Sequence, residues 1–193
     1  MTRTIVHHGH HARSQRGFSL IDTIVTLSIM GIVGSMATVQ ISTVRRSIQG
    51  DGAMRVVMAQ LNTARGMAIT QRRNMEVRFV GSNLLQIVRD EVPAGTTVLT
   101  TVAFESNAKY SLVAGVGDTP DGFGNASAIS FGAALTIMFG PNGTLIDNDG
   151  NPVNGTAFLS ILSNPESFRA VTVMGATGRV RGYRWNGTVW TRV

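Results

Sequence analysis

The sequence contains no cysteine, and its four histidines all lie within the first eleven residues. Residues 12–193 therefore carry neither a thiol nor an imidazole, which excludes cysteine nucleophiles, disulfides and the usual zinc ligands there. Serine and threonine are plentiful, but no pattern supplies them with a base, and no glycine-rich phosphate loop joins a predicted strand to a helix. The sequence predicts a protein that is not an enzyme and needs no cofactor.

Lysine is nearly absent, since Lys109 is the only one among 17 basic residues. The formal net charge of +6 includes three arginines of the first 17 residues: Arg3, Arg13 and Arg16. Arg45, Arg46 and Arg55 follow the first long apolar segment, so the positive charges on its two sides nearly balance. Charge alone therefore indicates no membrane orientation.

That apolar segment runs over residues 18–39 and contains a single charge, Asp22. As a helix its 22 residues would extend roughly 33 Å, which is enough to cross a hydrocarbon core of about 30 Å. We predict a transmembrane helix here. Asp22 is anomalous, because a carboxylate at mid-depth costs about 2.5–3.5 kcal/mol on insertion scales.

A positive partner inside the membrane would explain Asp22. Cleavage between Gly17 and Phe18 would create an α-amino group, which could pair with Asp22 of a neighbouring subunit while apolar helices pack together. The alternatives are an ordinary signal anchor or a cleaved secretory signal. The second has an apolar region of about 7–15 residues and an Ala-x-Ala-like exit, and this segment is longer and lacks that exit.

The residues Gly17-Phe18-Ser19-Leu20-Ile21-Asp22 resemble the class III leader junction of type IV pilins and type II secretion pseudopilins. In that family a prepilin peptidase cuts after the glycine and methylates the new N-terminal phenylalanine. The resemblance implies a cleaved leader over residues 1–17, processing at Gly17 and Phe18, and a filament-assembly role for Asp22. The family usually has Glu where this chain has Asp22.

Beyond the apolar segment, residues 40–72 continue as an amphipathic helix. Its apolar stripe comprises Met54, Val57, Met58, Leu61, Ala64 and Ala68. We expect Gly50-Asp51-Gly52 to mark a kink or a local loosening.

From Met75 onward the apolar period falls to two, which predicts β-strands. The expected strands cover residues 75–80, 84–89, 97–104, 109–114, 128–131, 135–139, 157–162, 168–174 and 179–185. Val189 and Trp190 close a last hairpin across Asn186-Gly187. The loop 115–126, rich in Gly and Asp, is expected to be mobile. A long helix followed only by strands indicates an α+β fold in which antiparallel sheet packs on the helix.

This layout resembles the GspH/FimT group of pseudopilins and minor pilins, on the segments 64–68, 137–143, 169–173 and 178–181. The resemblance implies a pilin-like fold in which residues 73–193 form an exported domain. It implies a single-pass protein of the bacterial inner membrane whose C-terminal domain is periplasmic or extracellular. The chain would be a minor pseudopilin or minor pilin at or near a filament tip. Its partners would be other pilins, the prepilin peptidase, and secreted cargo or DNA.

The loop Asp147-Asn148-Asp149-Gly150-Asn151 places oxygen ligands at alternate positions, as calcium-binding loops do. Pro152 stands where an EF-hand loop needs glycine, and no glutamate follows at the twelfth place. We predict a plain turn and no metal site.

Near the C-terminus, Arg179, Arg181 and Arg184 alternate with aromatic residues. Arginine can bind phosphate while aromatic rings stack on bases, and Gly178-Arg179-Val180-Arg181 resembles a Gly-Arg-x-Arg element implicated in DNA capture by FimT-type proteins. The alternative is a hairpin whose arginines only keep its edge soluble. A DNA-binding minor pilin for natural transformation is therefore the second hypothesis.

The leader motif generates the first prediction. In cells with active prepilin peptidase, the mature chain begins at N-methylated Phe18, because Gly17 precedes the apolar segment. Intact-mass measurement on the membrane fraction checks this, and a chain that retains residues 1–17 there contradicts it.

Overall fold

The computed structural model describes residues 19–132, 136–162 and 164–193, and it leaves the side chains of 37–43 undescribed. Its one long helix among these residues, α1, spans Leu20–Gln71. The chain divides into two compact units, Met1–Ile41 and Ser42–Val193. Gly17 and Phe18 lie outside the described residues, so the predicted transmembrane segment 18–39 is described only in part.

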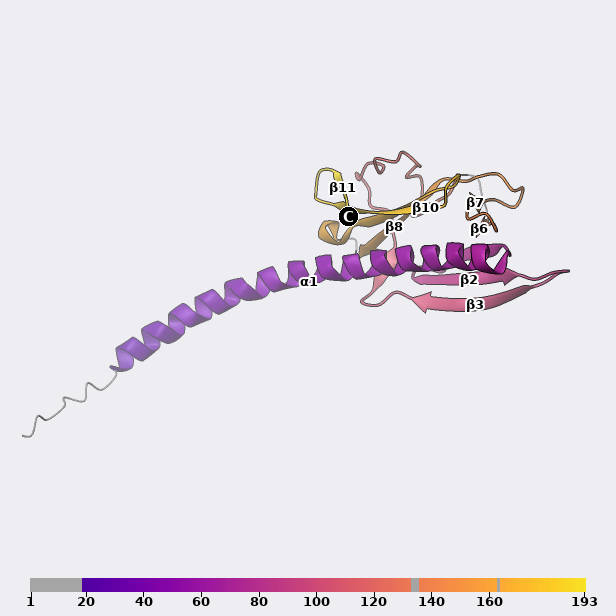
Figure 1. The fold of residues 1–193 in the computed structure, drawn as a ribbon. Helices are drawn as coiled ribbons and strands as arrows, with labels where there is room; N and C mark the ends of the chain where they lie inside the picture. Colours follow the sequence, from indigo (N-terminus) through magenta and orange to yellow (C-terminus); the bar gives the residue numbers. More distant parts are fainter. Residues whose placement is uncertain (1–18, 133–135, 163) are drawn as a thin grey trace, which may run out of the picture. The chain divides into compact units, whose positions relative to one another are not determined.

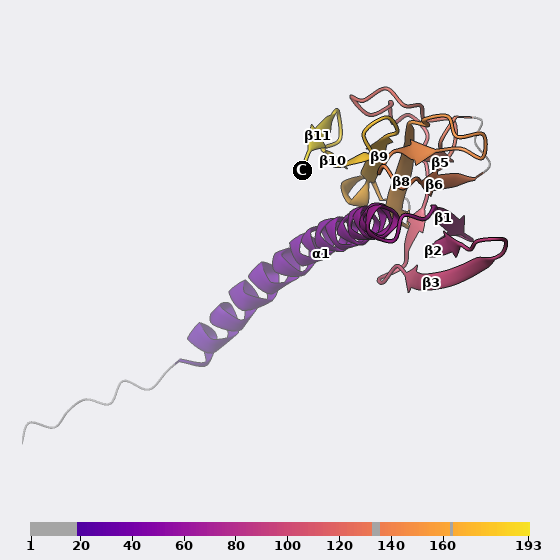
Figure 2. The same cartoon turned by 45° about the vertical axis from the view of Figure 1, so that its right-hand side comes forward.

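The second unit contains two antiparallel sheets (Figures 1 and 2). The first has the order β3-β2-β1-β6-β7, formed by Thr96–Ala103, Leu84–Asp90, Met75–Val80, Ile137–Phe139 and Leu145–Ile146. The second has the order β11-β10-β9-β8-β4, formed by Trp190–Arg192, Arg179–Trp185, Arg169–Met174, Gly155–Ile161 and Ala108–Tyr110. A short strand β5, Ile129–Ser130, also pairs with β8, and a 3-10 turn η1, Pro165–Ser167, precedes β9.

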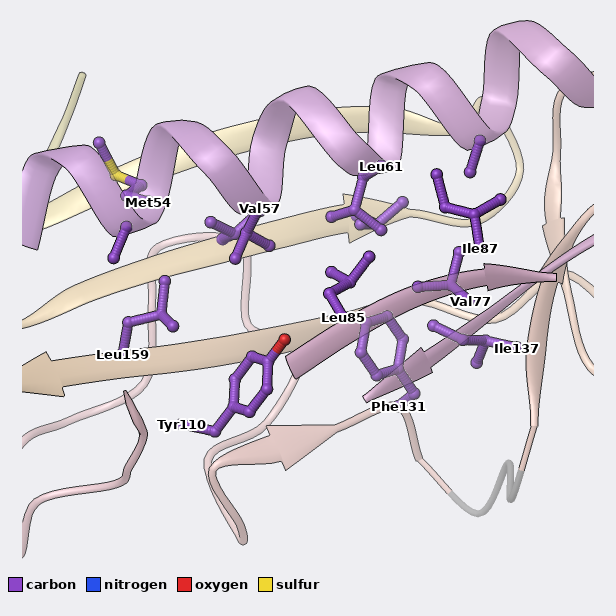
Figure 3. Packing of buried hydrophobic residues seen from close by; sticks show 14 of the residues in the cluster. Met54, Val57, Leu61, Val77, Leu85, Ile87, Tyr110, Phe131, Ile137 and Leu159 are labelled. Atoms are coloured by element: carbon purple, nitrogen blue, oxygen red, sulfur yellow. The ribbon is translucent and has the colours of Figure 1, made fainter. Parts of the chain in front are cut away.

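The second half of α1 packs on both sheets through the stripe that the sequence predicts. Met54, Val57, Leu61, Ala64 and Ala68 are buried in one apolar cluster with residues of both sheets. Figure 3 shows Val57 and Leu61 projecting from α1, with Leu61 close to Leu85 of β2 and Leu159 of β8 near Met54. The α+β prediction is therefore confirmed.

Most predicted strands are present, and those of residues 75–80 and 179–185 match at both ends. The last hairpin also forms as expected, since Trp185 pairs with Trp190 and the Asn186 side chain accepts from the N–H groups of Thr188 and Val189. The two tryptophan rings meet edge to face, with centroids 5.3 Å apart.

Two expectations were wrong, and two short elements were missed. The strand predicted over 109–114 ends at Tyr110, because Leu112 and Val113 turn into a second apolar cluster with Phe158 and Trp190. The strand β7 and the turn η1 were not predicted, since each is only two or three residues long. The second wrong expectation concerns Gly50-Asp51-Gly52.

Helix α1 continues without a break through Gly50 and Gly52. Gly50 is buried, and a Cβ built there would lie 2.7 Å from the carbonyl oxygen of Ser167. The absence of a side chain at Gly50 thus permits η1 to approach the helix backbone. The role of this glycine is in packing. Gly52, in contrast, faces open space.

Among the described residues, no helix contains a stretch both long enough and apolar enough to qualify as a membrane span.

The two glycines give a matched pair of substitutions. Gly50→Ala should lower the stability of the fold by about 1–3 kcal/mol, because the added methyl overpacks the contact with Ser167. Gly52→Ala should raise it by about 0.5–1 kcal/mol, because alanine is the better helix former and meets no neighbour. Thermal unfolding of the full chain in detergent, followed by circular dichroism, compares them. Equal effects of the two changes would contradict the proposed packing role of Gly50.

Candidate functional site

The first candidate site is the N-terminal part of α1, which exposes apolar side chains on every side. At least half of the surface of each long apolar side chain over residues 20–36 is accessible: Leu20, Ile21, Ile24, Val25, Leu27, Ile29, Met30, Ile32, Val33 and Met36. A helix that is apolar all round belongs inside a membrane or among other helices. This part of the chain therefore requires an apolar environment or partner.

The polar groups of this segment are satisfied within the helix. The hydroxyls of Thr23, Thr26 and Ser28 each donate to a backbone carbonyl four residues earlier. Such internal bonds leave no hydroxyl that must seek water, which suits a helix surrounded by hydrocarbon.

Asp22 is the exception in this segment. It lies in the first turn of α1, is exposed, and forms no ion pair with any described residue. A carboxylate near a helix N-terminus is favoured by the exposed N–H groups there, yet its full charge remains without a cation. The predicted partner, the amine of Phe18 in another subunit, lies outside the described residues.

A second site lies where η1 and β10 meet α1. The side chain of Arg169 is fully buried, and its Nε donates to Asp51 Oδ1 at 2.6 Å. Its Nη1 donates to the carbonyls of Glu166 and Phe168, and its Nη2 donates to the carbonyl and hydroxyl of Ser47. Every nitrogen of this guanidinium therefore has an acceptor.

Asp51 also pairs with Arg184 of β10, through its other carboxylate oxygen. Burial lowers the pKa of the Arg169 guanidinium, whereas its bonds to Asp51 act in the opposite direction. Arginine nevertheless stays charged in proteins, so one carboxylate from the helix pairs with cations from two strands.

A third site lies on the outer face of β9 and β10. Asp121 accepts hydrogen bonds from Thr172 Oγ1 at 2.6 Å and Tyr183 Oη at 2.9 Å, and it forms an ion pair with Arg181. Burial would raise the pKa of Asp121, but these bonds outweigh it and lower the pKa below its usual range. The loop 115–126 is thereby fixed to the sheet. Trp190 also donates to the carbonyl of Gly117 at 2.8 Å, so the expectation of a mobile loop is not supported.

The predicted phosphate-binding strip is divided by these contacts. Side chains alternate between the faces of a strand, so Arg179 and Arg181 share one face of β10, whereas Arg184 faces α1 and Asp51. Arg181 and Arg184 are already paired with carboxylates. Only Arg179 of the three is exposed and free of an ion pair among the described residues.

The loop 147–151 forms the plain turn that the sequence predicts. Asp147 Oδ1 accepts from the N–H groups of Asp149 and Asn151 at 2.9 and 2.8 Å. The bond from Asn151 is the largest of several that lower the pKa of Asp147. Within the described part of the chain, no group of three His, Cys, Asp or Glu residues is placed to hold a metal ion.

Sequence reasoning missed Asp51, Asp121 and Arg169. The signals were weak: Asp51 lies between two glycines, and Arg169 starts a mostly apolar strand. Nothing in the local pattern links residues 51 and 169, which are 118 positions apart.

No family model matches the sequence, and no curated protein matches it. Among solved structures, the crystal structure of the type IV minor pilin FimU from Pseudomonas aeruginosa is similar, with a TM-score of 0.47 and 17% sequence identity. The match covers 67% of this chain and 84% of the FimU chain. A likeness of this size does not assign the chain to a family.

The lowered pKa of Asp121 generates a pH prediction. Because the folded-state pKa lies below the usual value of about 3.9, the ionised carboxylate contributes stability above that value and loses it as the pH falls through the folded pKa. Asp121→Asn should lower the unfolding temperature at about pH 7, by the equivalent of about 1–3 kcal/mol, and the difference from wild type should shrink toward about pH 2.5. Thermal unfolding at the two pH values measures it.

Asp149→Asn is the control, because Asp149 is exposed and lies outside this network. It should leave the unfolding temperature nearly unchanged at both pH values. A constant difference between Asp121→Asn and wild type across the pH range would contradict the assigned role of the Asp121 charge.

Proposed function

We propose that the chain is a minor pseudopilin or minor pilin, a structural subunit of a type II secretion pseudopilus or a type IV pilus. The observation that carries the proposal is the N-terminal helix, whose described side chains are apolar all round apart from Asp22 and small polar residues. Asp22 stands five residues after Gly17, in the position where a newly formed amine of a neighbour could meet it.

In this proposal the leader of residues 1–17 is cleaved, and the helix from Phe18 resides in the inner membrane until assembly. The helices of successive subunits then pack together, and each Asp22 pairs with the Phe18 amine of a neighbour. The second unit, Ser42–Val193, is exported and lies at or near the tip, where it meets other pilins or secreted cargo. The prepilin peptidase is the processing partner.

The geometry favours this structural role over DNA capture. A phosphate strip built from Arg179, Arg181 and Arg184 would need Arg181 to leave Asp121 and Arg184 to leave Asp51. The second of these contacts belongs to the attachment of α1. DNA binding remains the alternative function, with Arg179 as its best-placed residue.

The proposal predicts that Asp22→Ala leaves cleavage intact but lowers incorporation into filaments by at least about tenfold, because loss of one member of a buried charge pair costs about 3–5 kcal/mol. Asp22→Glu should be incorporated normally, since glutamate keeps the carboxylate and extends its reach by one methylene. Immunoblots of sheared filaments, compared with total membranes, measure the ratio. If the Ala variant assembles as well as wild type, the charge pair is not needed and the proposal loses its main support.

A further inference from the structure

The two sheets end in strands of very different length. The terminal strands β7, β11 and β4 have only two, three and three residues. In addition, β11 contains Arg192 and β4 contains Lys109. Short edge strands with charged side chains are common protection against unwanted strand pairing.

Strand β3, Thr96–Ala103, is neither short nor charged. It is eight residues long, it ends the first sheet, and its sequence Thr-Thr-Val-Leu-Thr-Thr-Val-Ala contains no charge and no proline. One side of β3 pairs with β2, and no described strand pairs with the other side. Every second residue therefore directs its N–H and C=O away from the sheet.

The side chains of β3 also suit pairing. Val98 is 52% exposed, and Thr96, Thr97, Thr101 and Ala103 are exposed too. β-branched residues of this kind favour extended strands. A single register shift opposite Ile87 and Val88 interrupts the pairing of β3 with β2. Leu99 lies at this shift and packs against the apolar core. Before and after Leu99, the pairing of β3 with β2 is regular.

We propose that the outer edge of β3 pairs with β3 of a second copy of this chain, as antiparallel strands about a twofold axis. This pairing goes beyond the proposed function. It rests on that function in one respect: the apolar helices keep copies of the chain together in one membrane.

A second copy fits this edge because β3 is complementary to itself. Antiparallel pairing places threonine, valine and alanine opposite one another, with no like charges in contact within the eight residues. The contact is isologous and closes at two copies. A strand pair of this length buries less than the roughly 1,200 Å² of a stable interface. Pairing therefore depends on copies that are already neighbours, as apolar helices in one membrane would be.

Cysteine cross-linking on the full chain in membranes tests the proposal, because the chain contains no cysteine of its own. Single cysteines are placed at each position from Thr96 to Ala103 and bridged by oxidation or a short bis-maleimide. Antiparallel pairing brings equivalent residues close only near the twofold axis, and disulfides require Cα atoms about 4.4–6.8 Å apart. A dimer band should therefore appear at a few adjacent positions. Val189→Cys is the control, because Val189 is 54% exposed and lies in the turn between β10 and β11 of the other sheet.

A pair of lysine substitutions separates strand pairing from mere proximity. Val98→Lys, combined with the best cross-linking cysteine at another position, should reduce the dimer band at least about fivefold, since each pairing edge then carries a lysine, and lysine on an edge strand opposes pairing. Val189→Lys, nearly equal to Val98→Lys in exposure, should leave the band unchanged. Equal loss, or no loss, with both variants would overturn the proposal.

Leu27→Cys on the exposed apolar helix shows separately whether copies associate through α1. Cross-linking at Leu27 without any at β3 overturns the pairing of β3 and leaves the proposed function intact. If cysteines in β3 cross-link only to a different protein, the partner of β3 is not a second copy of this chain, and the proposal is overturned. If neither Leu27 nor β3 forms cross-links, the pairing of β3 is overturned, while the proposed function, in which α1 packs against other pilins, is decided by the Asp22 variants.

Discussion

The attachment of α1 to the second sheet depends on a buried charge pair. Asp51 supplies the carboxylate from the helix, and Arg169 supplies a guanidinium that has no contact with solvent. A charge removed from water is costly unless each of its hydrogen-bonding groups is satisfied, and here three backbone carbonyls and one hydroxyl complete the set. The pair adds a specific polar contact to the apolar packing of the helix on the sheet.

Two glycines allow this arrangement. At Gly50 the backbone of Ser167 lies where a side chain would be, and at Gly182 the sulfur atoms of Met54 and Met58 do so. The helix therefore approaches η1 and β10 more closely than side chains would permit. Two of the three carbonyls that bind Arg169 belong to residues 166 and 168, which flank this contact. Close packing and charge satisfaction therefore both involve this short segment.

Much of the architecture could be predicted from periodicity. The stripe from Met54 to Ala68 and the strands over residues 75–80 and 179–185 are repeated local patterns, and the structure follows them. The ion pairs could not be predicted, because Asp51, Asp121, Arg169 and Arg181 meet only after the sheets form. Gly50-Asp51-Gly52 was misread for the same reason: two glycines in a helix favour a kink when the neighbour that needs their space is unknown. The three C-terminal arginines looked like one surface because sequence spacing does not show which carboxylates face them.

The hairpin of β10 and β11 holds both tryptophans of the chain, Trp185 and Trp190, in one edge-to-face pair. Intrinsic tryptophan fluorescence of this protein therefore reports a single place, within residues 185–190, and does not report on the N-terminal helix. Because the Trp190 indole N–H donates to the carbonyl of Gly117, the emission should respond to release of the 115–126 loop. Far-ultraviolet dichroism, dominated by α1, observes a different part of the molecule, so the two signals together distinguish local opening from global unfolding.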